Sequence, residues 1–358
     1  MELGEIVSMP ARIERDGVVL ESDGSDFEIE GVLNPASART RDGKLLLYPR
    51  AVAKSNVSRI EVVEAQGNSW KRVGFALEPQ EPYEFRNVPG GYGCEDPRVT
   101  FVPLLDAYVM VYTAFGPEGP RIAIALSRDA YEWERLGLVD FSALGRGDDK
   151  DGVFFPEPVI SPEGVTSFAF YHRPMQYLYQ EDGDTKVPHV LSKLPHQREC
   201  TRIAYVPLEA ALRDHSKLLQ VAESTLVLDA SGSWGQIKNG AGTPPVRIDE
   251  GWLSFFHGVD PILDAAGNFQ RMRYSAGIVV HDIERPHIVR YRSPEPVLVP
   301  ENSDERHGIV PDVVFPTAID TRSDRAYDVY YGMADSRIGR LQVELGSSEV
   351  EGAQESAA

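Results

Sequence analysis

The chain has 358 residues, which is enough for two average domains or for one large all-β domain. Hydrophobic residues make up 42% and charged residues 25% of it, as is typical of a globular protein with a sizeable core. The net charge of −19 argues against nucleic acid and anionic membrane surfaces as partners, because both require a cationic face.

The N-terminal stretch lacks the basic and apolar segments of a signal peptide, and no apolar run approaches the roughly 20 residues that span a bilayer. Cys94 and Cys200 are too few for a disulfide framework and fit a reducing compartment. We therefore expect a cytoplasmic protein.

One pattern recurs along the chain: a proline, a short strand, a turn, a strongly apolar strand, and then a ring-bearing residue. Within each copy, the proline and the ring are 13 to 15 positions apart, which suits a hairpin of two strands. The five pairs are Pro35 with Tyr48, Pro97 with Tyr112, Pro156 with Tyr171, Pro244 with His257, and Pro316 with Tyr331. The intervals between copies leave room for a four-stranded sheet each, since known propeller repeats take roughly 40 to 50 residues.

Helical periodicity is scarce, and the best candidate is a short peripheral helix within 207–222. Many short strands in five similar units predict an all-β, five-bladed β-propeller, with a pair of β-sandwiches as the alternative. We expect one catalytic domain over 1–345. The polar tail, 346–358, is expected to be disordered.

Acids and bases from different copies lie beside the prolines or after the apolar strands, where a propeller brings them to a common central cavity. A structural core would have apolar side chains there, so the set indicates a functional site. Its members are Asn34, Arg50, Glu95, Asp96, Arg98, Lys150, Arg173, Lys238, His257, Asp260, Asp312 and Asp335.

Six segments resemble, in order, the signature segments of glycoside hydrolase family 130, and together they run from about Asn34 to about Leu345. The segments are "GCEDPRVT", "KDGVFFPEPV…FYHRPM", "KNGAGTPPVRIDEGWLSFFHGVD", "RSPEPVLVPE", "VPDVVFP" and "VYYGMADSRIGR". The resemblance implies a five-bladed propeller that acts on β-mannosides, because the family contains β-mannoside phosphorylases and some β-mannoside hydrolases.

By this resemblance, Asp96 of "EDPR" is the proton donor, acting through the mannose 3-hydroxyl as a relay. A donor at neutral pH needs a raised pKa, and we expect the adjacent Glu95 and a partly buried site to raise that of Asp96. Taken alone, an Asp-Pro after glycines is an ordinary loop, and that interpretation stays open for Glu95.

Inverting phosphorolysis requires one acid and a phosphate on the opposite face of the sugar, and phosphate calls for cationic groups. The resemblance places the phosphate site at Lys150, Arg173, Lys238 and His257. The turn after Lys150 is longer than is usual in the family, so Arg146 is an alternative to Lys150. Each basic residue taken singly is more often a solvated or structural group.

The resemblance implies that five residues bind the mannosyl unit at the cleaved bond: Asn34, Arg50, Glu95, Asp260 and Asp335. Tyr92 and Tyr331 are candidates for stacking on a sugar or, equally, for packing. The insertion over 177–202 is expected to shape the acceptor side of the site.

No catalytic metal and no cofactor is expected besides phosphate as a co-substrate, because His189, His196 and Cys200 match no standard zinc spacing. The sequence thus predicts an inverting phosphorylase that converts a β-mannoside oligosaccharide and phosphate to α-mannose 1-phosphate and an acceptor sugar. A β-mannoside hydrolase, with water and a glutamate base, and a non-catalytic carbohydrate-binding propeller are the alternatives. No motif specifies an oligomeric state, and a homo-oligomer is compatible with the sequence.

Overall fold

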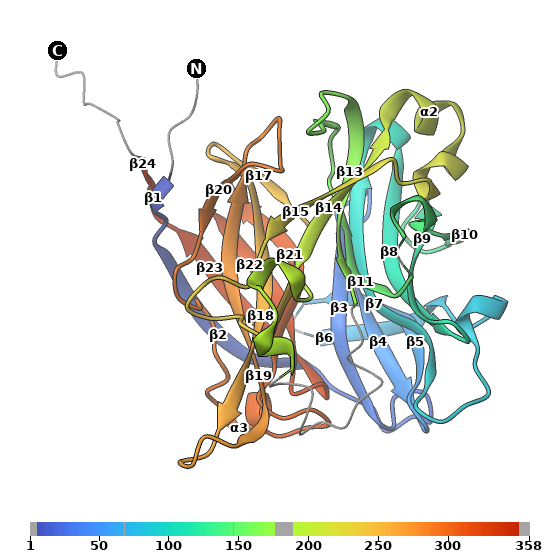
Figure 1. The fold of residues 1–358 in the computed structure, drawn as a ribbon. Helices are drawn as coiled ribbons and strands as arrows, with labels where there is room; N and C mark the ends of the chain where they lie inside the picture. The colour runs from blue at the N-terminus through green and yellow to red at the C-terminus, as the bar shows by residue number, and fades with distance from the viewer. Residues whose placement is uncertain (1–5, 68, 146, 176–188, 351–358) are drawn as a thin grey trace.

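The fold was analysed in a computed structural model that describes residues 6–67, 69–145, 147–175 and 189–350. It is all-β, as predicted, with strands nearly throughout and only short helices (Figure 1). None of the helices in these described ranges is long and apolar enough to cross a membrane.

The largest sheet has eight strands made of two antiparallel groups of four. The strands of the first group are β3 (Gly31–Arg39), β4 (Leu45–Ala53), β5 (Val57–Gln66) and β6 (Ser69–Leu77). Those of the second are β7 (Tyr92–Val102), β8 (Ala107–Gly116), β9 (Gly119–Ser127) and β10 (Glu134–Leu138). Within the sheet, the two groups meet at a short parallel pairing of Val57 and Ser58 with Tyr92 and Gly93.

Three further antiparallel sheets follow along the chain. The third group has β11 (Asp149–Phe154), β12 (Val159–Ile160), β13 (Thr166–Pro174), β14 (Thr201–Pro207) and β15 (Glu223–Leu228). The fourth has β16 (Lys238–Ala241), β17 (Val246–Ile248), β18 (Gly251–Leu263), β19 (Phe269–His281) and β20 (Val289–Arg292). The fifth has β21 (Val314–Ser323), β22 (Ala326–Met333), β23 (Arg337–Leu345) and the N-terminal β2 (Ala11–Leu20).

The two ends of the chain meet in the fifth group, where β2 lies beside β23 (Figure 1). Beyond it, β1 (Ile6–Ser8) pairs with β24 (Glu349–Val350), and the Gly346 amide donates to the Pro10 carbonyl at 2.8 Å. The prediction of a disordered tail from Gly346 is therefore wrong for these residues, and 351–358 lie outside the described residues.

The core consists of apolar side chains packed between neighbouring sheets. Val111 and Ile122 of the second group, for example, lie in one buried cluster with Phe154 and Phe170 of the third. Aromatic and β-branched residues suit such packing, and each fully buried side chain contributes roughly 1.5–3 kcal/mol.

The predicted peripheral helix is present but shorter than 207–222. The helix α2 (Leu208–Arg213) ends at Asp214, whose backbone is extended and whose carboxylate caps a following 3₁₀ turn (His215–Leu219). Aspartate favours such caps because its side chain competes for backbone amides. A second short α-helix, α3 (Ser303–Arg306), is a single turn with an asparagine cap. Both lie at the edge of the molecule (Figure 1).

The strand register corrects the proline alignment of the repeats. Pro35 lies opposite the strand that carries Tyr48, but Tyr171 pairs with Val153 and His257 with Gly240, so Pro156 and Pro244 fall beyond their strands. The third and fourth copies therefore start several residues before their prolines.

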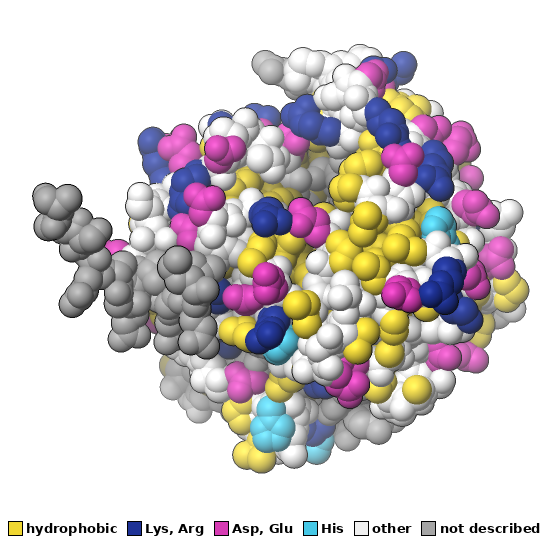
Figure 2. Space-filling view, turned by 90° about the horizontal axis from the view of Figure 1, so that it is seen from above, with side chains coloured by type: hydrophobic (Ala, Val, Ile, Leu, Met, Phe, Trp, Pro, Cys, Tyr) yellow, Lys and Arg dark blue, Asp and Glu magenta, His cyan; other side chains and the backbone are white. Residues whose placement is uncertain are grey.

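On the face seen in Figure 2, apolar side chains gather near the middle, and acidic and basic side chains are mixed around them. The negative charge of the chain is thus not collected into one patch on this face, and the site has to be located from its contacts.

Candidate functional site

Three polar residues occupy equivalent β-bulges at the start of the first, second and third groups. Asn34, Asp96 and Asp151 have positive φ angles of 43°, 45° and 58°, and the pairing of each strand shifts register at that position. A bulge redirects a side chain, and asparagine and aspartate tolerate this backbone region best among non-glycine residues. The sheets therefore place one polar side chain each at comparable points.

Asp96 is the centre of a buried group of residues that we call the acid cluster. Its members are Asn34, Arg50, Glu95, Asp96, Lys150 and Asp335. Asn34 Nδ2 donates to Asp96 Oδ1 at 2.9 Å, and Arg50 Nη1 donates to the same oxygen at 3.3 Å. Arg50 Nη2 and Lys150 Nζ donate to the two oxygens of Glu95 at 2.9 and 3.0 Å. Glu95 is therefore a buried, doubly paired carboxylate and not a loop residue.

In the acid cluster, the carboxyl group with a raised pKa is Asp335 and not the predicted Asp96. Burial acts to raise the pKa of Asp96, but Arg50, Lys150, Arg98 and the Asn34 hydrogen bond outweigh it, so that this pKa is lowered. The expectation of a raised pKa at Asp96 is thus wrong for the ligand-free protein. Burial and the nearby Asp96 carboxylate instead raise the pKa of Asp335 to about 6.

A second group, the anion cluster, holds three of the four residues predicted to bind phosphate. Its members are Asp151, Arg173, Glu199, Lys238 and His257. Arg173 is fixed by two carboxylates, with Nε donating to Asp151 Oδ2 and Nη1 to Glu199 Oε2, each at 2.6 Å. His257 Nε2 lies 3.7 Å from Asp151 Oδ2.

The basic residues of the anion cluster do not all carry charge. Burial lowers the pKa of His257 to about 3, and Arg173, Lys238 and Arg98 act in the same direction, so the imidazole is neutral at pH 7. Burial would also lower the pKa of Lys238, yet Tyr274 and Glu199 leave it raised and the amine charged. His257 Nδ1 is buried and has no hydrogen-bond partner among the described residues.

Arg98 connects the two clusters. Its Nη1 donates to the Asp96 carbonyl at 2.9 Å, and its Nη2 lies 4.0 Å from Asp151 Oδ1. The guanidinium is almost fully buried and also donates to the Gly242 carbonyl, so it is held on three sides. Asp96 and Asp151 are therefore neighbours across one arginine.

Two predicted site residues have a different setting. Lys150 pairs with Glu95, which places it in the acid cluster. Asp260 accepts the backbone amides of Gly235 and Gln236 at 3.0 Å each, so both of its oxygens hold a turn. The alternative cation, Arg146, lies outside the described residues, as does 176–188 of the predicted acceptor insertion.

The remaining candidates are placed as follows. Tyr331 is fully buried and its hydroxyl donates to Glu305, so its packing interpretation is confirmed. Tyr92 is half-buried against Phe85, and Asp312 pairs with Arg271. No group of three or more metal-binding side chains occurs among the described residues.

Sequence reasoning missed Asp151 and Glu199. Asp151 had a detectable pattern, because it precedes a glycine where Asn34 and Asp96 precede prolines in the equivalent strands. Glu199 follows the predicted insertion, and nothing in its local sequence distinguishes it.

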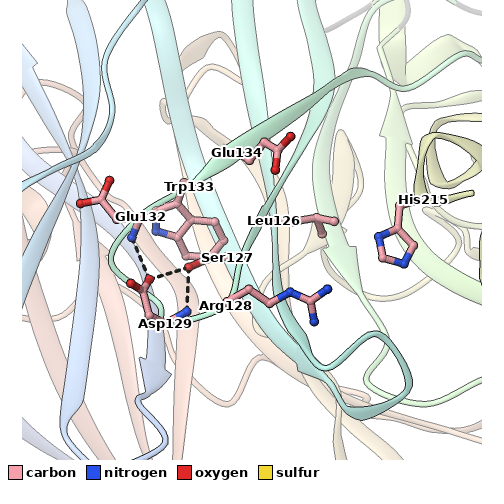
Figure 3. Close-up of a pocket in the computed structure, with 8 residues that line it drawn as sticks. All are labelled: Leu126, Ser127, Arg128, Asp129, Glu132, Trp133, Glu134 and His215. Carbon is pink, nitrogen blue, oxygen red and sulfur yellow. Dashed lines mark hydrogen bonds between the residues drawn. The ribbon is translucent and has the colours of Figure 1, made fainter.

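Two hollows elsewhere carry none of the predicted site residues. One, of about 380 Å³, lies beside β9 and His215, and Asp129 there accepts hydrogen bonds from Ser127 and Glu132 within a turn (Figure 3). The other, of about 690 Å³, is lined by residues 37–41 and 99–101, which follow Asn34 and Asp96 in the chain, and by residues of other sheets. Its Arg39 and Arg247 are paired with acids.

Comparison with known protein families assigns the chain to the carbohydrate-active enzymes. Residues 10–194 and 216–346 match the family model described as beta-1,4-mannooligosaccharide phosphorylase, and the chain belongs to this family, glycoside hydrolase family 130.

Named relatives and solved structures are similar over most of the chain. A 1,2-beta-oligomannan phosphorylase of a Thermoanaerobacter species is 29% identical over 93% of this chain and 97% of its own. A beta-1,2-mannobiose phosphorylase of the same strain is 26% identical over 89% and 92%. The structure of the Listeria innocua beta-1,2-mannobiose phosphorylase aligns with a TM-score of 0.69 at 20% identity, covering 93% of this chain and 97% of that one.

Proposed function

We propose that this protein is an inverting β-mannoside phosphorylase that converts a β-mannoside and phosphate to α-mannose 1-phosphate and a free sugar. The observation that carries the proposal is the connection of a buried carboxylic acid centre to a basic cluster through Arg98. Phosphorolysis requires these two parts on opposite faces of one sugar ring. Family membership and the names of the relatives support the choice of substrate.

In the proposed reaction, a phosphate oxygen held by the anion cluster attacks the anomeric carbon while the bond from that carbon to the leaving oxygen breaks. Asp96 supplies the proton that the leaving oxygen takes up, and phosphate remains bonded to the mannosyl carbon. Inorganic phosphate supplies the nucleophile, so no second catalytic carboxylate is needed. Asn34, Arg50, Glu95 and Asp335 orient the mannosyl unit, with Asp260 supporting the neighbouring turn.

The ligand-free electrostatics assign two tasks to the acid cluster. The cations around Asp96 favour its ionised form, so productive binding has to separate the carboxylate from Arg50 or Lys150 before it can carry a proton. Asp335, whose pKa is raised to about 6, is the neighbouring group that retains a proton at mildly acidic pH.

We further propose that the five groups of strands are the blades of a five-bladed β-propeller formed by a single domain over 1–345. Five units of four or five strands in chain order support this, as does the pairing of β2 with β23, which joins the N-terminal strand to the last unit. The three equivalent bulges then face one axis.

The linkage most worth testing first is β-1,2, since two relatives that align with about nine-tenths of this chain are named for β-1,2-mannosides. A synthesis assay tests the function: protein, α-mannose 1-phosphate and single acceptors (mannose, β-1,2-mannobiose, β-1,4-mannobiose, glucose, N-acetylglucosamine), with phosphate release followed. Release with a mannose-based acceptor supports the proposal. No release with any acceptor, together with cleavage of β-mannosides in phosphate-free buffer, would identify a hydrolase instead.

A further inference from the structure

The anion cluster contains two carboxylates, which is unusual for a site that receives an anion. Asp151 and Glu199 each have about 3% of their surface exposed, and both are bound to Arg173. Arg173 is consequently neutralised before any ligand arrives. The pKa of Asp151 lies well below its ordinary value despite burial, because the guanidinium groups of Arg173 and Arg98 lie beside it, so it remains ionised at neutral pH.

An ionised carboxylate accepts hydrogen bonds and cannot donate them. His257 adds a second acceptor, because a neutral imidazole keeps a lone pair on one nitrogen. With the proton on Nε2, the nitrogen 3.7 Å from Asp151 Oδ2, that lone pair lies on Nδ1. That Nδ1 is the buried atom that lacks a partner among the described residues. Asp151 and His257 thus present acceptor atoms beside the charged donors of Arg173 and Lys238.

Asp151 and His257 both pack directly against the backbone of Gly240. A Cβ added to Gly240 would lie 2.0 Å from Asp151 Oδ2 and 2.4 Å from His257 Cε1, so the backbone of β16 holds the carboxylate and the imidazole together. Because Asp151 is bonded to Arg173 and lies beside His257, we expect a tetrahedral oxyanion bound by Arg173 and Lys238 to place at least one oxygen near an acceptor.

We propose that Asp151, with the imidazole of His257 beside it, makes this site selective for a protonated tetrahedral oxyanion, hydrogen phosphate, against sulfate. Hydrogen phosphate keeps a proton at pH 7 and donates it to Asp151 or to His257 Nδ1. Sulfate has no proton and would bring an oxygen lone pair against a buried acceptor, which weakens binding because neither group is then matched by a donor. The inference rests on the proposed function, because it assigns selectivity to the proposed phosphate site.

The test compares three oxyanions in the wild-type enzyme at pH 7. Phosphate-dependent cleavage of a β-mannoside is measured with sulfate as an inhibitor, and arsenate, which is protonated like phosphate, replaces phosphate in parallel. We expect a sulfate inhibition constant at least about tenfold above the KM for phosphate, and arsenate-dependent cleavage with a KM within a few-fold of that for phosphate. Equal affinities for sulfate and phosphate would overturn the proposal while leaving the phosphorylase assignment intact.

Two variants separate hydrogen-bond matching from charge. Asp151→Asn keeps an acceptor for Arg173 and gains an amide donor, so the ratio of the sulfate inhibition constant to the phosphate KM should fall by about tenfold or more. Glu199→Gln removes the same charge from the same arginine and should leave that ratio within about threefold of wild type. Equal changes of the ratio in both variants would mean that charge alone acts, and would contradict the proposal.

The selectivity for hydrogen phosphate can be tested even if the protein is not a phosphorylase. If no oxyanion supports cleavage, calorimetric titration of the wild-type protein with phosphate and with sulfate still decides the inference. Phosphate binding at least tenfold tighter than sulfate supports it, and equal binding, or none by either, overturns it. If Asp151→Asn does not fold, as judged by circular dichroism, the wild-type comparison remains decisive.

Discussion

The acid cluster and the anion cluster begin from the same local structure and reach opposite electrostatic states. Both contain an aspartate on an equivalent bulge, Asp96 in one and Asp151 in the other, and both aspartates contact an arginine. In the acid cluster a further carboxylate, Asp335, has its pKa raised to about 6, so it keeps a proton at mildly acidic pH. In the anion cluster, the arginine is held by two carboxylates and the histidine has lost its charge.

The comparison shows that the bulge determines the position of each carboxylate. The neighbouring charged residues determine its protonation and its partners. An acid that shares cations with another acid can exchange protons with it. A carboxylate that binds an arginine through charge-assisted hydrogen bonds serves to orient that arginine. Substitutions in one cluster should consequently affect proton delivery, and substitutions in the other should affect the use of phosphate.

The largest effect is expected from Asp96→Asn. The amide keeps the shape and the contacts of the side chain but supplies no acidic proton, so kcat should fall by about 10²- to 10⁴-fold. Initial rates of phosphorolysis measure it, with Asp320→Asn as a matched control, because Asp320 pairs with Arg39 away from both clusters. Wild-type activity in Asp96→Asn would remove Asp96 from the role of donor.

A steric change in β16 should affect the KM for phosphate more than the KM for the mannoside. In Gly240→Ala, the added methyl group displaces Asp151 and His257, and we expect the KM for phosphate to rise about 10- to 100-fold with a smaller change in that for the mannoside. Gly147→Ala is the control, because a Cβ there meets nothing within 4 Å. A rise confined to the mannoside KM would show that the anion cluster is not the phosphate site.

Arg173→Lys tests the geometry of the double ion pair. Lysine keeps the charge but cannot reach Asp151 and Glu199 with the fixed fork of a guanidinium, so we expect a rise of about tenfold in the KM for phosphate. Steady-state kinetics with varied phosphate measure this rise. An unchanged KM would mean that charge suffices and that the orientation of Arg173 is immaterial.

The smallest effect concerns stability and pH. The pKa of Asp335 is raised from 3.8 to about 6 in the folded protein. The protonated carboxyl group therefore contributes fully to the free energy of unfolding below about pH 4, and this contribution is lost as the pH rises through 6. The asparagine in Asp335→Asn does not titrate, so the stability of this variant does not show this decrease with pH. The free energy of unfolding of wild type relative to the variant should fall by about 1–2 kcal/mol between pH 4 and 7, after allowance for solvent screening of a half-buried group. Urea denaturation at both pH values measures it, and a relative gain by wild type would contradict the assignment.

The sequence was sufficient for the all-β class, the five groups of strands and the meeting of Asn34, Arg50, Glu95 and Asp96. Alternating apolar strands and polar strand ends carry that information locally. The sequence was not sufficient for the pKa of Asp96, because its lowering depends mainly on Arg50 and Lys150, which approach it from β4 and β11. Glu199 was missed for the same reason, since its contact with Arg173 exists only through the pairing of β13 with β14 and the turn before it.

The proline-based alignment failed for a physical reason as well. A bulge accommodates proline, which restricts the backbone, and glycine, which leaves it free. Gly152 therefore occupies the position in the third group that Pro97 occupies in the second. A search for the polar residue before the bulge would have found Asp151 together with Asn34 and Asp96.

The most direct test of the account is the fate of the mannosyl group when a β-1,2-linked mannobiose is incubated with the protein and phosphate. Phosphorus-31 nuclear magnetic resonance of the mixture distinguishes the outcomes. The account predicts a new phosphate-ester signal from α-mannose 1-phosphate, formed in equal amount with free mannose and absent with Asp96→Asn. Mannose released without any phosphate ester, at a rate independent of phosphate, would contradict it.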